Sequence, residues 1–251
     1  MAGRKRSLRG KIEKKVVSSR RSKRRKSYTV DLRVHTPASS GYFGIEGLDT
    51  APAMISLAKV KGIDVIAVTD FYSGAYVDRL IEASQGSPIT IIPGVDIRCS
   101  LNVCRDMVLT CLFQEDFGSA QINALLTRLG VPESAYGDRS YIVQREFDEI
   151  VNEVEKVGGR VIPSRMDKTP QRLSVLPLLV EKYGFRTFDL AYADSKEYFK
   201  KRWPRIKFNL FSFSNANSLA QLGSRTAKLM MHVEGFVGIK DLVAREARLA
   251  R

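Results

Sequence analysis

The stretch TVDLRVHTPASSG, residues 29–41, has the pattern of an apolar strand that ends in polar side chains. Successive side chains of a strand point to opposite faces, so Arg33 and His35 lie on the same face at its end. Two histidines at this spacing would form a metal-binding pair, but the first position holds an arginine. The stretch therefore predicts a site at the end of a strand and leaves open whether that site binds a metal.

Six further stretches are short and rich in apolar and β-branched residues, which is typical of buried strands. The seven expected strands are 28–35, 64–69, 89–97, 107–113, 160–163, 187–192 and 208–213. Segments with helical periodicity alternate with them at 50–61, 75–84, 120–129, 144–157, 170–183 and 196–203. Repeated strand and helix units predict a mostly parallel sheet covered by helices. Seven strands favour a barrel, and an open doubly wound sheet is the alternative.

The net charge of +14 is concentrated at the start of the chain. Residues 1–27 hold 13 of the 41 Lys and Arg and one of the 27 Asp and Glu, so they carry +12 and the remainder carries +2. A segment of this composition cannot bury enough apolar surface to fold alone, so it is predicted to be a disordered arm that binds nucleic acid or a ribonucleoprotein. The residues expected to contact phosphates are Arg4, Lys5, Arg6, Arg9, Arg20, Arg21, Lys23, Arg24, Arg25 and Lys26.

The rest of the chain indicates one cytoplasmic α/β domain over residues 28–251, with 114–143 as a surface insertion or lid. Cys99, Cys104 and Cys111 lie in or near apolar runs, and they are expected to be reduced packing residues. No stretch approaches the roughly 20 apolar residues of a membrane span. No apolar core of a secretory signal follows the basic start, although an organelle transit peptide stays an alternative.

Polar side chains recur where the expected strands end, and ligands of parallel α/β folds bind at that edge. The strand-end positions are Arg33 and His35, 69–71, Asp96 and Arg98, 164–168, and 214–217. The sequence therefore predicts one site that is built from several strands.

Five sequence motifs carry a family resemblance. They are DLRVHTPAS (31–39), GIDVIAVTDF (62–71), IIPGVDI (91–97), GGRVIPSRMD (158–167) and FSFSNANSLAQLG (211–223). In order and approximate spacing they resemble the PHP family, the polymerase and histidinol phosphatase domains. This resemblance implies a distorted (β/α)7 barrel of PHP type, up to three divalent ions, and hydrolysis of phosphate esters by a metal-activated water.

The resemblance also implies which positions would ligate metal. His35, Asp70 and Asp96 keep a residue that can ligate, whereas the replaced positions are Arg33, Phe71, Arg165, Asn215 and Asn217. Guanidinium groups place permanent positive charge where the ions would sit. We therefore expect no catalytic metal cluster, and at most one Zn, Mn or Mg ion on the three retained positions.

Three interpretations of the substitutions stay open. In the first, Arg33 and Arg165 form structural ion pairs with Asp70 and Asp96. In the second, a phosphate-type anion is bound without metal by Arg33, Arg98, Arg165 and Lys168. In the third, one ion supports a phosphoesterase or nuclease. The arm favours a non-catalytic PHP-like accessory factor that binds nucleic acid; the alternatives are that single-ion enzyme and a structural or regulatory subunit that senses an anion.

Three smaller features have two interpretations each. GYFG (41–44) is expected either to stack on a ring or to plug the site. KKRWPRIK (200–207) is expected to be a solvated helix end packed by Trp203, or part of a nucleic-acid footprint. KDLVAREARLAR (240–251) has helical periodicity and is expected to dock on the body or to meet a protein partner.

Overall fold

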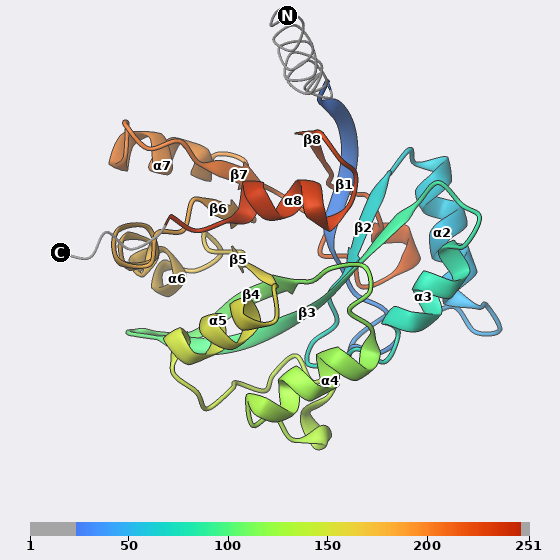
Figure 1. The fold of residues 1–251 in the computed structure, drawn as a ribbon. Coiled ribbons are helices and arrows are strands. Elements are labelled where there is room, and N and C mark those ends of the chain that lie inside the picture. The colour runs from blue at the N-terminus through green and yellow to red at the C-terminus, as the bar shows by residue number, and fades with distance from the viewer. Residues whose placement is uncertain (1–23, 247–251) are drawn as a thin grey trace, which may run out of the picture.

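The computed structural model describes residues 24–246. In this part of the chain, one sheet with the strand order β7-β6-β5-β4-β3-β2-β1-β8 curls into a nearly closed barrel (Figure 1). Its strands are β1 (Lys26–Val34), β2 (Val65–Val68), β3 (Thr90–Leu101), β4 (Cys104–Leu112), β5 (Arg160–Ser164), β6 (Thr187–Asp189), β7 (Asn209–Phe211) and β8 (Ala227–Met231). All seven expected strands are present, and β8 is an addition that the sequence did not predict.

One strand runs against the predicted direction. Strands β1, β2, β3, β5, β6 and β7 are parallel, whereas β4 is antiparallel to both β3 and β5. The cause is a tight turn at Asn102 and Val103 that joins β3 to β4, with Asn102 in the left-handed region at φ 52°. Consequently the site receives side chains from the middle of β4 rather than from its carboxyl end.

The barrel closes at the end where the parallel strands finish. Val34 of β1 forms a parallel bridge to Ala216, beyond β7, and His35 N donates to Ala216 O at 3.0 Å. At the other end β8 pairs antiparallel with the first half of β1, from Lys26 to Val30. This arrangement confirms the distorted (β/α)7 barrel, with β8 as an extra strand.

Two apolar cores lie on the two faces of the sheet. Along β2, Val65 and Ala67 belong to one buried cluster, and Ile66 and Val68 belong to the other. The first cluster fills the barrel and includes Phe236, Ile239 and Val243 of α8 (Phe236–Val243). Because this core packs the interior of the described barrel, we expect a ligand site at its mouth, where the parallel strands end.

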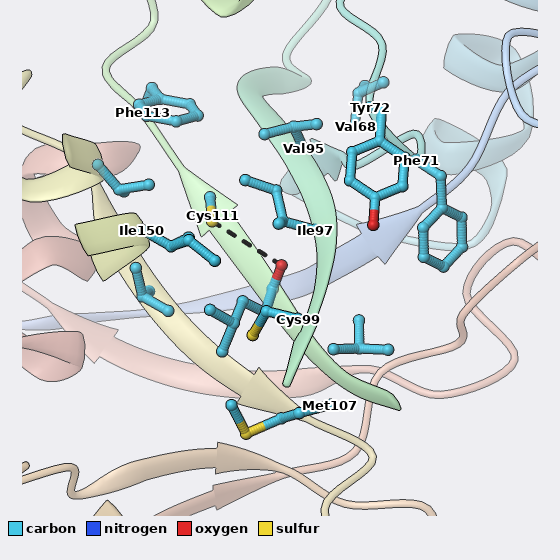
Figure 2. Close-up of a cluster of buried hydrophobic side chains, with 14 of the residues drawn as sticks. Val68, Phe71, Tyr72, Val95, Ile97, Cys99, Met107, Cys111, Phe113 and Ile150 are labelled. Atoms are coloured by element: carbon cyan, nitrogen blue, oxygen red, sulfur yellow. Dashed lines mark hydrogen bonds between the residues drawn. The ribbon is translucent and has the colours of Figure 1, made fainter. Parts of the chain in front are cut away.

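The second core lies between the strands and the surrounding helices. Figure 2 shows Val95, Ile97, Cys99 and Cys111 side by side, with Ile150 of α5 (Phe147–Lys156) packed next to them. Cys99, Cys104 and Cys111 are buried and free, as expected of packing residues. Burial raises the pKa of the Cys99 and Cys111 thiols, so both stay protonated at neutral pH.

Five of the six expected helices are present almost as predicted. They are α2 (Thr50–Val60), α3 (Val77–Ser84), α4 (Ser119–Arg128), α5 and α7 (Ser195–Arg202). The sixth, expected at 170–183, divides into α6 (Pro170–Ser174) and a π-helix (Leu178–Lys182). Pro177 precedes the second piece, and its missing N–H interrupts the helical hydrogen bonds.

The ends of the domain differ slightly from the prediction. β1 begins at Lys26, so the predicted 1–27 arm overlaps the first strand; residues 1–23 lie outside the described residues. Of the arm positions expected to bind phosphate, Arg24, Arg25 and Lys26 are described and exposed. At the other end, Arg245 pairs with Glu155 at 2.5 Å, so the described part of the last segment docks on the body. None of the described helices is long and apolar enough to cross a membrane.

Candidate functional site

A β-bulge in β1 turns the Arg33 side chain toward the site. Asp31 pairs with Ile66 and Val34 with Val68, so β1 holds one more residue than β2 over this interval. Bulges re-aim side chains beside functional sites. Here Leu32 joins the barrel core, while Arg33, the next residue, lines a pocket at the mouth.

At the base of the pocket, Asp96 of β3 contacts three other side chains. Its Oδ2 lies 2.8 Å from Arg33 Nε and 3.1 Å from His35 Nε2, and its Oδ1 accepts from Thr110 Oγ1 of β4 at 2.7 Å. Burial alone would raise the pKa of Asp96, but the Arg33 guanidinium and the bonds from His35 and Thr110 outweigh it and hold that pKa below its usual value. Asp96 is therefore an ionised partner of Arg33.

A second carboxylate faces Arg33, and the sequence analysis missed it. Asp189 ends β6, and its Oδ2 lies 3.7 Å from Arg33 Nη1, beyond hydrogen-bond distance. Neither atom has a hydrogen-bond partner in the described residues. Burial raises the pKa of Asp189 to about 6, against the opposing effect of Arg33. Its signal in the sequence was a lone acid within the apolar strand at 187–192.

Asp70, at the end of β2, serves a different purpose from the one implied for it. Its carboxylate accepts from Thr36 N at 2.7 Å, Thr36 Oγ1 at 2.5 Å and Ser39 Oγ at 2.6 Å. Burial raises its pKa, and these hydrogen bonds oppose the shift. Both oxygens are engaged in holding the loop after β1, so Asp70 is not an open ligand beside His35 and Asp96.

Above Asp96 lies a pocket of about 90 Å³. Its lining is Arg33, His35, Phe71, Arg98, Val108, Arg139, Arg165, Lys168, Arg172, Asn215 and Asn217. Six of these eleven side chains are cationic and none is a carboxylate. The structure thus brings together most of the predicted strand-end residues, and it adds Arg139 from the predicted insertion and Arg172 from α6.

Four of the cations form no ion pair with a described residue, although Arg165 is attracted by Asp189 and Arg98 by Asp106. The side chains of Arg98, Arg139, Arg165 and Lys168 make no hydrogen bond or ion pair within residues 24–246, whereas Arg172 pairs with Asp106 at 2.9 Å. Burial lowers the pKa of Arg98 and of Lys168, and repulsion from neighbouring cations adds to both shifts. An entering anion would relieve this repulsion.

The backbone around the pocket is held in uncommon conformations. Tyr72, Arg165 and Asn215 follow β2, β5 and β7, and their φ angles are 48°, 56° and 50°. The left-handed region is costly for side chains other than Gly and Asn, and such residues gather at functional sites. Arg165 N donates to Asp189 O at 2.7 Å, which fixes the position from which the guanidinium extends.

Aromatic and amide groups complete the wall. The Phe71 ring lies 5.1 Å from that of His35, centroid to centroid, and Asn217 Oδ1 lies 2.8 Å from His35 Nδ1. Both ring nitrogens of His35 are therefore engaged, one by Asn217 and one by Asp96. Phe43, from the GYFG motif, is 74% exposed and does not plug the site.

The residues at the mouth do not fit a cluster of metal ions. No group of three or more His, Cys, Asp or Glu side chains within the described part of the chain is arranged to hold a metal. A multinuclear cluster needs several anionic or imidazole ligands, and here the Arg33 guanidinium occupies Asp96. A single divalent ion would have to compete with that guanidinium for the same oxygen.

No protein-family model and no curated protein matches the sequence. Three solved structures are similar to the chain. One is a two-domain protein from Bacteroides vulgatus that contains a predicted PHP-like metal-dependent phosphoesterase, at 12% sequence identity and a TM-score of 0.57. The others, each at 13% identity and a TM-score of 0.53, are a protein from Bifidobacterium adolescentis assigned as a metal-dependent phosphoesterase and an amidohydrolase from Chromobacterium violaceum with bound sulfate and no metal.

The likeness covers nearly the whole body of the chain. It includes 87% of this chain and 63% of the Bacteroides protein, 88% and 97% for the Bifidobacterium protein, and 88% and 99% for the Chromobacterium protein. This chain thus spans less than two thirds of the Bacteroides protein. At these identities the likeness establishes the fold, and the chain is an α/β barrel of the PHP type.

Proposed function

We propose that this protein is a non-hydrolytic PHP-like barrel that binds a phosphate-type anion at its mouth without a metal cluster. The observation that carries the proposal is a set of four cations around a pocket that no carboxylate lines. Within the described residues, the side chains of Arg98, Arg139, Arg165 and Lys168 form no ion pair or hydrogen bond. Guanidinium groups suit the bidentate recognition of phosphate oxygens. The sulfate in the Chromobacterium structure supports an anion site in this fold.

The charged side chains of the site form an inner and an outer layer. In the inner layer Arg33 is neutralised by Asp96 and Asp189, so it acts mainly in structure. In the outer layer are the four cations that form no ion pair with a described residue, and these are available to a ligand. Ester hydrolysis needs an activated water, and His35 has both ring nitrogens hydrogen-bonded already. This arrangement supports the proposal of binding rather than turnover.

Replacing Arg165 with asparagine weakens the binding of inorganic phosphate about tenfold or more, because it removes a charge-assisted contact. Asparagine tolerates the left-handed backbone of this position, so the fold should survive. The measurement is calorimetric titration with phosphate, together with the rise in Tm that phosphate causes in a protein that binds it when folded. The matched control is Lys59→Asn, which removes an exposed cation of α2 away from the pocket.

Phosphate binding that is equal in the Arg165 variant and the wild type would contradict the proposal. A second contradicting result would be phosphomonoesterase activity in purified protein that contains one equivalent of Zn, Mn or Mg, if Asp96→Ala removes both the activity and the metal. That second result would identify the single-ion enzyme instead.

Sulfate binds more tightly as the pH falls from 7 to 5. Asp189, whose pKa burial raises to about 6, takes up a proton in this range, so one negative charge behind the pocket disappears. The groups that face it are Arg33, Arg165 and Asp96, and His35 shares the site. The Asp189→Asn variant tests whether Asp189 causes this pH dependence. We expect the variant to bind sulfate tightly already at pH 7 and to show a flatter pH profile in calorimetry. An equally steep profile in the variant contradicts the assignment.

The proposed function has a second part, which is nucleic-acid or ribonucleoprotein binding through the basic segment 1–27. Its support is the charge of +12 on that segment, against +2 for the rest of the chain. Most of these positions lie outside the described residues, and only Arg24, Arg25 and Lys26 have a described place, at the start of β1.

A further inference from the structure

We infer that residues 196–207, which run through α7 to the start of β7, form a second nucleic-acid-binding surface outside the pocket. This segment holds six Lys and Arg and one Glu, so it carries +5, whereas residues 28–251 together carry +2. The rest of the body is therefore slightly acidic, and the segment is a local concentration of positive charge. The inference concerns a different surface from the anion pocket and does not depend on it.

The backbone of the segment is fixed by aromatic packing. Trp203 follows α7, is 8% exposed, and lies 5.8 Å from the Phe199 ring and 5.7 Å from the Phe208 ring, centroid to centroid. Its Nε1 donates to Glu181 Oε1 at 3.0 Å. Trp203 is thus a packing anchor, as one interpretation of this motif expected, and it holds the neighbouring cations in place.

The cations themselves point into solvent and are mostly unpaired. Lys200 pairs with Glu197 at 2.7 Å. The exposed side chains that form no ion pair with any described carboxylate are Lys196, Lys201, Arg202, Arg205 and Lys207. These five charges are available to phosphates without the loss of a salt bridge to any residue of 24–246.

The topology places the end of this segment at the end of the barrel where β1 begins. β7 starts at Asn209, just after the segment, and β1 starts at Lys26. The two strands run in the same direction, and β8 pairs with the first half of β1. Their starting ends therefore lie at the same end of the barrel. In Figure 1, β8 lies beside the start of β1, and α7 lies further to the left, beyond β7 and α8. Lys228 of β8, opposite Thr29, adds an exposed cation beside β1.

A phosphodiester backbone is the partner that fits this surface. A helix that lies on a membrane exposes bulky apolar side chains beside its cations. In α7 Phe199 is buried, as is Trp203 just after the helix, and Tyr198 is 39% exposed. The surface has charge without an apolar face, which suits electrostatic contact with RNA or DNA.

The test is the salt dependence of nucleic-acid binding by the full chain. Fluorescence anisotropy with a labelled single strand, as RNA and as DNA, compares the wild type with the double variant Arg202→Gln and Arg205→Gln. Each phosphate contact that is removed lowers the slope of log K against log salt by about 0.7 on a single strand, so we expect a decrease of about 1.4. The matched control is Lys59→Gln and Arg105→Gln, which removes two exposed cations elsewhere and leaves the net charge equal.

Equal slopes in the double variant and its control would overturn the inference, because net charge alone would then explain binding. Binding to vesicles of anionic lipid that falls in the double variant, with no change on RNA or DNA, would also overturn it. The Arg165→Asn variant should bind nucleic acid like the wild type. Its phosphate binding tests the pocket, so failure of one proposal is distinguishable from failure of the other.

Discussion

Replacing Arg33 with methionine lowers the free energy of unfolding by about 3 to 5 kcal/mol, since it removes one partner of a buried ion pair and leaves the other charged. Asp96 is fully buried and would lose its bond to Arg33 Nε at 2.8 Å, and Asp189 would lose the only described guanidinium within 4.0 Å. Methionine has a similar length, so the destabilisation reflects charge more than volume. Urea unfolding of both proteins measures it.

The control for this prediction is an exposed ion pair of the same type. Arg79 pairs with Asp49 at 2.9 Å, with side chains 55% and 49% exposed, so Arg79→Met is expected to cost at most about 1 kcal/mol. In a double-mutant cycle, Arg33→Met and Asp96→Asn together should cost clearly less than the sum of the single changes. Additive effects, or an Arg33 variant as stable as the Arg79 variant, would contradict a structural ion pair at the base of the site.

Removing residues 1–23 weakens binding to RNA and DNA by about a hundredfold or more near physiological salt, because protein contacts to phosphates release counterions. The deletion takes away ten Lys and Arg and one Glu and leaves all described residues in place. The salt slope should fall in proportion to the number of phosphates that the arm neutralises. Fluorescence anisotropy with labelled oligonucleotides, at several salt concentrations, measures both the affinity and the slope.

A variant whose first 23 residues have the same composition in scrambled order is the control. It should keep most of the affinity, because contacts of this kind follow charge density rather than sequence. If the deletion binds as tightly as the full chain, the prediction for the arm is wrong and the described body carries the binding. In that case, the double variant Arg202→Gln and Arg205→Gln would show whether residues 196–207 are the main nucleic-acid-binding surface.

Local pattern in the sequence was sufficient for much of the fold. The apolar runs found all seven barrel strands, and the helical periodicity found five helices nearly to the residue. The strand-end positions Arg33, His35, Arg98 and Arg165 do meet in one pocket. These features could be predicted because alternation and periodicity are properties of neighbouring residues, and because the ends of parallel strands lie at one edge of a sheet.

The sequence alone also shows the positive charge of residues 1–27 and the presence of Arg33 at the end of the first strand. The tertiary structure decided which charges meet. It turned β4 antiparallel, placed Asp189 rather than Asp70 beside Arg33, and brought the arginines and the lysine of the strand ends around one pocket. Direction, register and pairing depend on contacts between residues far apart in the chain, and local periodicity carries no information about them.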